Sequence, residues 1–118
     1  MPWDNNEAFS SGKGDCSALS FGMTEIGDDW PLISYILDDS EYKATYEGYL
    51  EQFVDEVFTV DKMTEAYETY DELIKEYAYQ EVSGYSFLSS DSDYDSAVET
   101  LKSHVVERNA ALESYLEE

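Results

Sequence analysis

The run WDNNEAF over residues 3–9 sets acidic and amide side chains between two aromatic residues. Asp4 and Asn6 offer hard oxygen ligands two positions apart. Mg²⁺ prefers one or two carboxylates together with phosphate oxygens and water, and kinases use an Asp and an Asn to hold it against a nucleotide. These residue types favour a site for magnesium and a nucleotide. A solvated loop accounts for two such residues equally well.

Length and charge narrow the classes of partner. The 118 residues are 42% hydrophobic, which is enough for one modest core. Six Lys+Arg against twenty-eight Asp+Glu give a formal net charge of −22, so the surface repels polyanions. We therefore expect neither nucleic acid nor an anionic membrane as a partner. The acids are interleaved with apolar residues through the second half of the chain, which indicates a folded chain rather than an acidic tail.

Two regions follow from the composition. Residues 1–29 carry recurring Gly, Ser and Asp with no apolar period, so we expect an irregular segment there. Residues 30–118 predict an acidic helical domain. Its expected helices are a short one from Pro31 to Leu37, one from Ser40 to about Val57, one after Thr59 to Ala78, and one from about Ser92 nearly to the C-terminus.

The fold class predicted is all-α, a small bundle of three main helices plus the short N-terminal helix. Asp38 and Asp39 are expected to end the first helix and cap the second, and Asp38 with Glu41 resembles a capping box. Thr59 is the expected cap of the third helix. The one- or two-residue gap between these two helices predicts that they form an antiparallel hairpin. Their apolar stripes, at helical spacing, are expected to be buried: Tyr42, Tyr46, Tyr49, Leu50, Phe53, Val54 and Val57 in the second helix, and Met63, Ala66, Tyr67, Tyr70, Leu73, Ile74, Tyr77 and Ala78 in the third.

Other candidate residues have simpler interpretations. Cys16 is the lone cysteine, so it forms no internal disulfide, and no oriented His supports a nucleophilic role. The run from Asp91 to Asp95 starts like a calcium loop, but a serine and a lysine stand where Gly and Glu are needed, so helix capping is favoured. His104 has no second ligand nearby and is expected to be a partly buried structural residue. The tyrosine stripes favour core packing over a stacking surface for sugars or peptides.

The order of several phrases along the chain resembles the spore-coat protein H (CotH) family of atypical kinases. WDNNEAF is similar to that family's tryptophan-aspartate-x-asparagine motif, which is followed by a small residue and Phe. Further similar phrases are WPLI at 30–33, EYKATY at 41–46, FTVDKM at 58–63 and VVERNAAL at 105–112. The resemblance covers essentially all 118 residues. It implies a full-length parent protein with a kinase-like fold, which transfers phosphate from ATP to coat or secreted proteins.

Carried over from the family, Asp4 binds the metal ion and Asn6 is the neighbouring polar ligand, so both are the predicted metal and cofactor-binding residues. Trp3 and Phe9 would orient them. Ser10 and Ser11 depart from the glycine that often follows the motif in the family. The resemblance implies Mg²⁺ and ATP as cofactors of the parent, and an extracellular or spore-coat location.

No catalytic residue is assignable within the chain. Phosphoryl transfer needs a lysine on the phosphates, a cover over the nucleotide and an Asp at the attacking hydroxyl. None of the five lysines lies in a glycine-rich context: Lys13, Lys43, Lys62, Lys75 and Lys102. We therefore expect the parent's N-terminal kinase lobe to be the missing partner, and the isolated chain to be inactive and to hold no cofactor. An acidic helical module for basic proteins is the alternative, and adaptation to high salt is a third interpretation.

Overall fold

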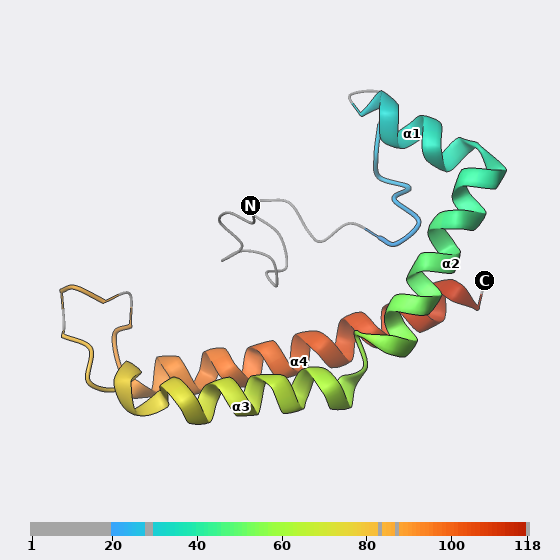
Figure 1. The fold of residues 1–118 in the computed structure, drawn as a ribbon. Helices are drawn as coiled ribbons and strands as arrows, with labels where there is room; N and C mark the ends of the chain where they lie inside the picture. Colours follow the sequence, from blue (N-terminus) through green and yellow to red (C-terminus); the bar gives the residue numbers. More distant parts are fainter. Residues whose placement is uncertain (1–19, 28–29, 83, 87, 118) are drawn as a thin grey trace.

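All regular secondary structure in the described residues is helical. The computed structural model describes residues 20–27, 30–82, 84–86 and 88–117. They contain α1 (Pro31–Asp38), α2 (Ser40–Glu56), α3 (Val60–Ala78) and α4 (Asp91–Leu116) (Figure 1). The predicted all-α class, with three main helices after a short one, is confirmed. The boundary between 1–29 and 30–118 stays a prediction. No described helix has the length and apolar character needed to cross a membrane.

Local capping chemistry sets where the helices begin. Pro31 occupies the first position of α1, where its missing N–H costs least. The cap of α2 is Asp39, whose carboxylate accepts the N–H groups of Glu41 and Tyr42. Of the two aspartates predicted to cap α2, Asp39 is confirmed. The capping box with Asp38 is wrong, because α1 continues through Asp38 and only Asp39 has the extended backbone of a cap. Thr59 caps α3, as predicted.

The helices pack in a different order from the one predicted. α3 and α4 lie antiparallel, α2 packs on α4, and α1 contacts α2 alone (Figure 1). The predicted hairpin of α2 with α3 is wrong, since these two helices do not contact each other. The short connection turns the chain without folding α3 back along α2. α4, with 26 residues, is long enough for α2 and α3 to pack on separate parts of its surface.

The core is small and centred on α4. Val105 and Leu112 are almost completely buried, and Asn109 lies between them on the same helix. The buried apolar residues are Val54, Phe58, Tyr94, Val105 and Leu112. The radius of gyration is 17.6 Å, whereas a compact domain of this length has about 13 Å. The helices therefore form an elongated and open arrangement.

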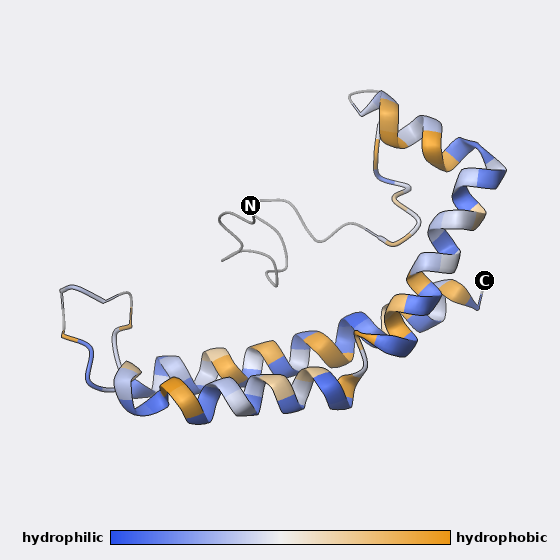
Figure 2. Cartoon of the chain, in the orientation of Figure 1, coloured by the Kyte–Doolittle hydropathy of each residue, from blue (hydrophilic) through white to orange (hydrophobic). Residues whose placement is uncertain are grey.

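Much of the predicted apolar surface remains in contact with solvent. In α2 this holds for Tyr42, Tyr49, Phe53 and Val57, and in α3 for Tyr70, Leu73, Ile74 and Tyr77. The expectation that both stripes are buried is wrong for these residues. Both helices lie against α4, and α2 also contacts α1, but these neighbours leave the exposed part of each stripe uncovered. Figure 2 shows apolar positions continuing along α1, which lies away from the α3–α4 hairpin.

Candidate functional site

The predicted metal ligands Asp4 and Asn6 lie outside the described residues, as do Trp3, Phe9 and Cys16. Their roles stay predictions. The described chain begins eleven positions after Phe9, at Ser20. Residues 20–27, here called the anchor segment, are thus the described part of the chain that follows the motif most closely.

Two helices hold the anchor segment through Phe21. The Tyr46 hydroxyl on α2 donates to the Phe21 carbonyl at 2.9 Å. On α4, the Arg108 guanidinium carbon lies 4.2 Å from the centre of the Phe21 ring, a cation–π distance. The Tyr115 ring lies 6.3 Å from the same ring. Phe21 is therefore fixed by its backbone on one side and its ring on the other.

Turns within the anchor segment complete its shape. The Met23 N–H donates to the Ser20 carbonyl, and the Ile26 N–H donates to that of Met23. Ser20 donates both its hydroxyl and its N–H to the Glu25 carboxylate. The hydroxyl contact is the main cause that lowers the pKa of Glu25. Met23 has a left-handed φ of 47°, which is uncommon for a residue with a side chain.

A hollow of about 400 Å³ separates the anchor segment from the last turns of α4. Arg108, the single arginine of the sequence, lines it together with Phe21 and Tyr115. Burial raises the pKa of Tyr46, and Arg108 partly opposes that rise. The Tyr46 hydroxyl therefore stays protonated and acts as a hydrogen-bond donor. The Tyr115 hydroxyl reaches α2 by donating to Glu47 at 3.0 Å.

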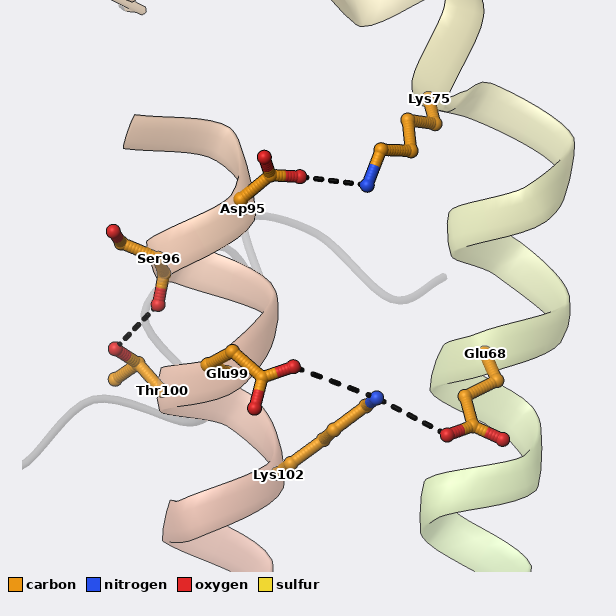
Figure 3. A network of polar contacts seen from close by, with 7 residues as sticks. All are labelled: Glu68, Lys75, Asp95, Ser96, Glu99, Thr100 and Lys102. Atoms are coloured by element: carbon orange, nitrogen blue, oxygen red, sulfur yellow. Dashed lines mark hydrogen bonds and ion pairs between the residues drawn. The ribbon is translucent and has the colours of Figure 1, made fainter. Parts of the chain in front are cut away.

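A second polar cluster ties α3 to α4 (Figure 3). Lys75 and Tyr79 both bind one carboxylate oxygen of Asp95, each at 2.7 Å. The hydrogen bond from Lys75 is the main cause that lowers the pKa of Asp95, and the same bond raises the pKa of Lys75. About two turns along, Lys102 bridges Glu68 at 3.1 Å and Glu99 at 3.6 Å. These contacts fix helix register and present no vacant ligand set.

The run from Asp91 to Asp95 belongs to the capped start of α4, as predicted, although the cap itself is Ser90, one residue before the run. The Ser90 hydroxyl and the carbonyl of the same residue accept the Asp93 N–H, and the Asp93 carboxylate accepts the Ser89 N–H. Asp95 is bound to Lys75 on the neighbouring helix. In the part of the chain that the structure describes, no three His, Cys, Asp or Glu residues form a group able to hold a metal ion. His104 is partly buried on α4, as predicted, and its structural role stays a prediction.

Sequence reasoning did not find the residues that hold the anchor segment. Arg108 belongs to one of the family-like phrases, and its being the sole arginine of an acidic chain is the one signal that distinguishes it. Tyr46 is indistinguishable by sequence from the other tyrosines of α2. Asn109 likewise carries no local signal for its contact with the Phe58 carbonyl at 2.8 Å.

Comparison with known protein families decides what these helices belong to. A family model described as CotH kinase protein matches residues 1–112. The chain belongs to the CotH kinase family. The match includes the WDNNEAF motif, the anchor segment and the α4 residues Arg108 and Asn109. No curated protein and no solved structure matches the chain significantly.

Proposed function

We propose that this chain is the C-terminal helical portion of a CotH-like protein kinase, which in its full length transfers phosphate from ATP to coat or secreted proteins. The observation that carries the proposal is the family match over residues 1–112, which includes the complete WDNNEAF run. In this proposal Asp4 binds Mg²⁺ and Asn6 supports it, because a carboxylate and an amide oxygen suit a magnesium ion held against phosphates. Trp3 and Phe9 orient the pair.

The contacts of the lysines support the view that the phosphate-binding lysine lies in another lobe. Four lysines are described, and each is engaged by the helices themselves. Lys75 and Lys102 pair with carboxylates between α3 and α4. Lys43 pairs with Glu47 within α2, and Lys62 donates to the Glu56 carbonyl near the end of α2. A lysine that binds nucleotide phosphates needs its ammonium directed at them, so we assign that role to the parent's N-terminal lobe.

Kinase assays on the full-length parent and on this chain test the proposal. With Mg²⁺ and ATP, we expect the parent to phosphorylate an acceptor and the isolated chain to show no activity. Asp4→Asn should abolish the parent's activity, because it removes the charged ligand. Asp15→Asn is the matched control, with the same charge change outside the motif, and should leave activity intact. Activity of the isolated chain, or an active Asp4→Asn parent, would refute the assignment.

A second candidate, an acidic module that binds basic proteins, is favoured by one feature. Large apolar side chains are exposed on a chain with a net charge of −22, a combination that suits a cationic partner with an apolar patch. Binding to a cationic protein that weakens with salt, and that is unchanged by deletion of residues 1–29, would favour this candidate over the kinase fragment.

A further inference from the structure

An uncharged, mainly aromatic groove of about 470 Å³ lies between α1 and α2. Four of its seven lining residues are tyrosines. The seven are Leu32, Tyr35, Ile36, Tyr42, Thr45, Tyr46 and Tyr49. Leu32 is 70% exposed and Tyr49 is 68% exposed. The Tyr35 and Tyr42 rings lie 6.5 Å apart across the helix junction. This surface has the composition of a protein interior and is open to solvent.

The weak support of α1 indicates that the groove is covered in the working protein. α1 has eight residues and contacts α2 alone among the helices. An isolated helix shorter than about 12 residues is marginal in water, and helices of this length depend on packing. Monomeric proteins rarely leave apolar patches of this kind open. A second body on the groove would supply the missing packing.

Charge argues against a second copy of this chain as that body. Residues 30–57 contain one lysine, Lys43, and seven acids: Asp38, Asp39, Glu41, Glu47, Glu51, Asp55 and Glu56. No charged side chain lines the groove itself. A second copy would bring a further net charge of −22 to an acidic rim, which opposes association. The complementary surface is therefore apolar at its centre and basic at its edge.

We propose that the α1–α2 groove is the seat for the nucleotide-binding lobe of the same polypeptide, which docks through an apolar patch edged by Lys or Arg. This inference rests on the proposed function. A lobe in the same chain covers the groove permanently, because a tether keeps its effective concentration high. α1 is also joined to the anchor segment, since Trp30 N–H and the Ser34 hydroxyl both donate to the Gly27 carbonyl. The groove thus adjoins the part of the chain that follows the motif.

Hydroxyl-radical labelling of tyrosines, compared between this chain and the full-length parent, tests the docking. The reporters are Tyr35, Tyr42 and Tyr49 in the groove. Tyr85, which is 94% exposed in the loop before α4, is the internal control. We expect labelling of the three groove tyrosines to fall several-fold in the parent while Tyr85 is unchanged. Equal labelling of the groove in both proteins would overturn the proposal. The proposal would also be overturned if the groove tyrosines of the isolated chain were already protected and sedimentation showed that this chain forms a dimer.

A matched pair of substitutions provides the second arm. Leu32 in the groove is 70% exposed, and Leu73 on α3 is 65% exposed. Leu32→Ser should leave the melting temperature of this chain unchanged and should lower the melting temperature of the parent. Leu73→Ser should lower the melting temperature of the parent by a smaller amount. The reverse order would place the lobe on α3 and overturn the proposal.

ATP binding by the parent separates this inference from the kinase assignment. A parent whose groove is protected but which binds no ATP supports docking of the N-terminal lobe and contradicts the assignment of that lobe as nucleotide-binding and of the parent as a kinase. A parent that is an active kinase with an open groove contradicts the docking alone. The two results involve different readouts, so neither can be mistaken for the other.

Discussion

The contact between Asn109 and the Phe58 carbonyl offers a direct test of how α4 holds the α2–α3 connection. Asn109 donates its side-chain amide across 51 positions to this carbonyl at 2.8 Å. Both residues are 9% exposed. The carbonyl belongs to the short connection after α2, where it has no helical partner of its own. In Asn109→Ala, the Phe58 carbonyl loses the only hydrogen bond that the described residues give it.

The expected loss of stability combines two opposing effects. Leaving a buried carbonyl unsatisfied costs about 1–3 kcal/mol. Alanine is a better helix former than asparagine by roughly 0.5–0.7 kcal/mol, which offsets part of that cost. We therefore expect Asn109→Ala to lower the free energy of unfolding by roughly 0.5–2.5 kcal/mol. Asn109→Asp should cost more at neutral pH, because it directs a carboxylate at the carbonyl oxygen.

Urea unfolding followed by far-ultraviolet circular dichroism measures both variants. Ser103→Ala, at an exposed position of α4, is the matched control for helix propensity and should be neutral or slightly stabilising. The deficit of Asn109→Asp relative to the wild type should shrink at acidic pH, where the protonated side chain can donate to the Phe58 carbonyl. An Asn109→Ala protein as stable as the Ser103→Ala control would refute the idea that this hydrogen bond clamps the connection.

Three further predictions concern the core, the anchor segment and the α3–α4 network. Leu112→Ala, at a position that is 1% exposed, should cost about 2–5 kcal/mol in urea unfolding. Gly22→Ala would place a Cβ 3.3 Å from a ring carbon of Tyr115, so amide exchange across residues 20–26 should accelerate while the melting temperature changes little. The ion pair of Lys75 and Asp95 should stabilise the chain fully between the unfolded pKa of Asp, about 3.9, and the unfolded pKa of Lys, about 10.4. At low pH this stability is lost as pH falls through the lowered folded pKa of Asp95, and at high pH it is lost as pH rises through the raised folded pKa of Lys75. The difference in melting temperature between wild type and Asp95→Asn, measured across pH, checks this window.

Local chemistry explains which features could be predicted from the sequence. Helix type and approximate bounds follow from apolar spacing, and the Thr59 cap follows from a residue acting on its own first turn. The error at Asp38 is also local, since two adjacent aspartates compete for one cap and the sequence does not rank them. Predictions that depend on a few neighbouring residues therefore hold to within about one position.

Packing partners could not be predicted in the same way. A helical stripe says which face is apolar, but Tyr49 and Leu73 show that an apolar face need not be covered. The absence of contact between α2 and α3 depends on the length of α4, which provides a separate surface for each. Periodicity contains no information on that competition, so the expected hairpin was assigned to the wrong pair of helices.

The candidate site also has a part that the sequence predicts and a part that only the structure shows. Asp4 and Asn6 are visible to sequence reasoning because they lie two positions apart within one motif. The residues that hold the anchor segment are visible only in three dimensions, since Tyr46 reaches Phe21 across 25 positions and Arg108 meets it from the other end of the chain. A motif identifies chemistry, whereas its support comes from residues whose only shared property is their position in the fold.

The second half of α4 links all of these features. Arg108 faces the anchor segment, Asn109 faces the α2–α3 connection, and Leu112 is buried in the core. Successive residues of a helix point about 100° apart, so adjacent positions such as 108 and 109 can serve different neighbours while a residue one turn on serves the core. A shift of α4 along its axis would therefore disturb the anchor segment and the helix connection together.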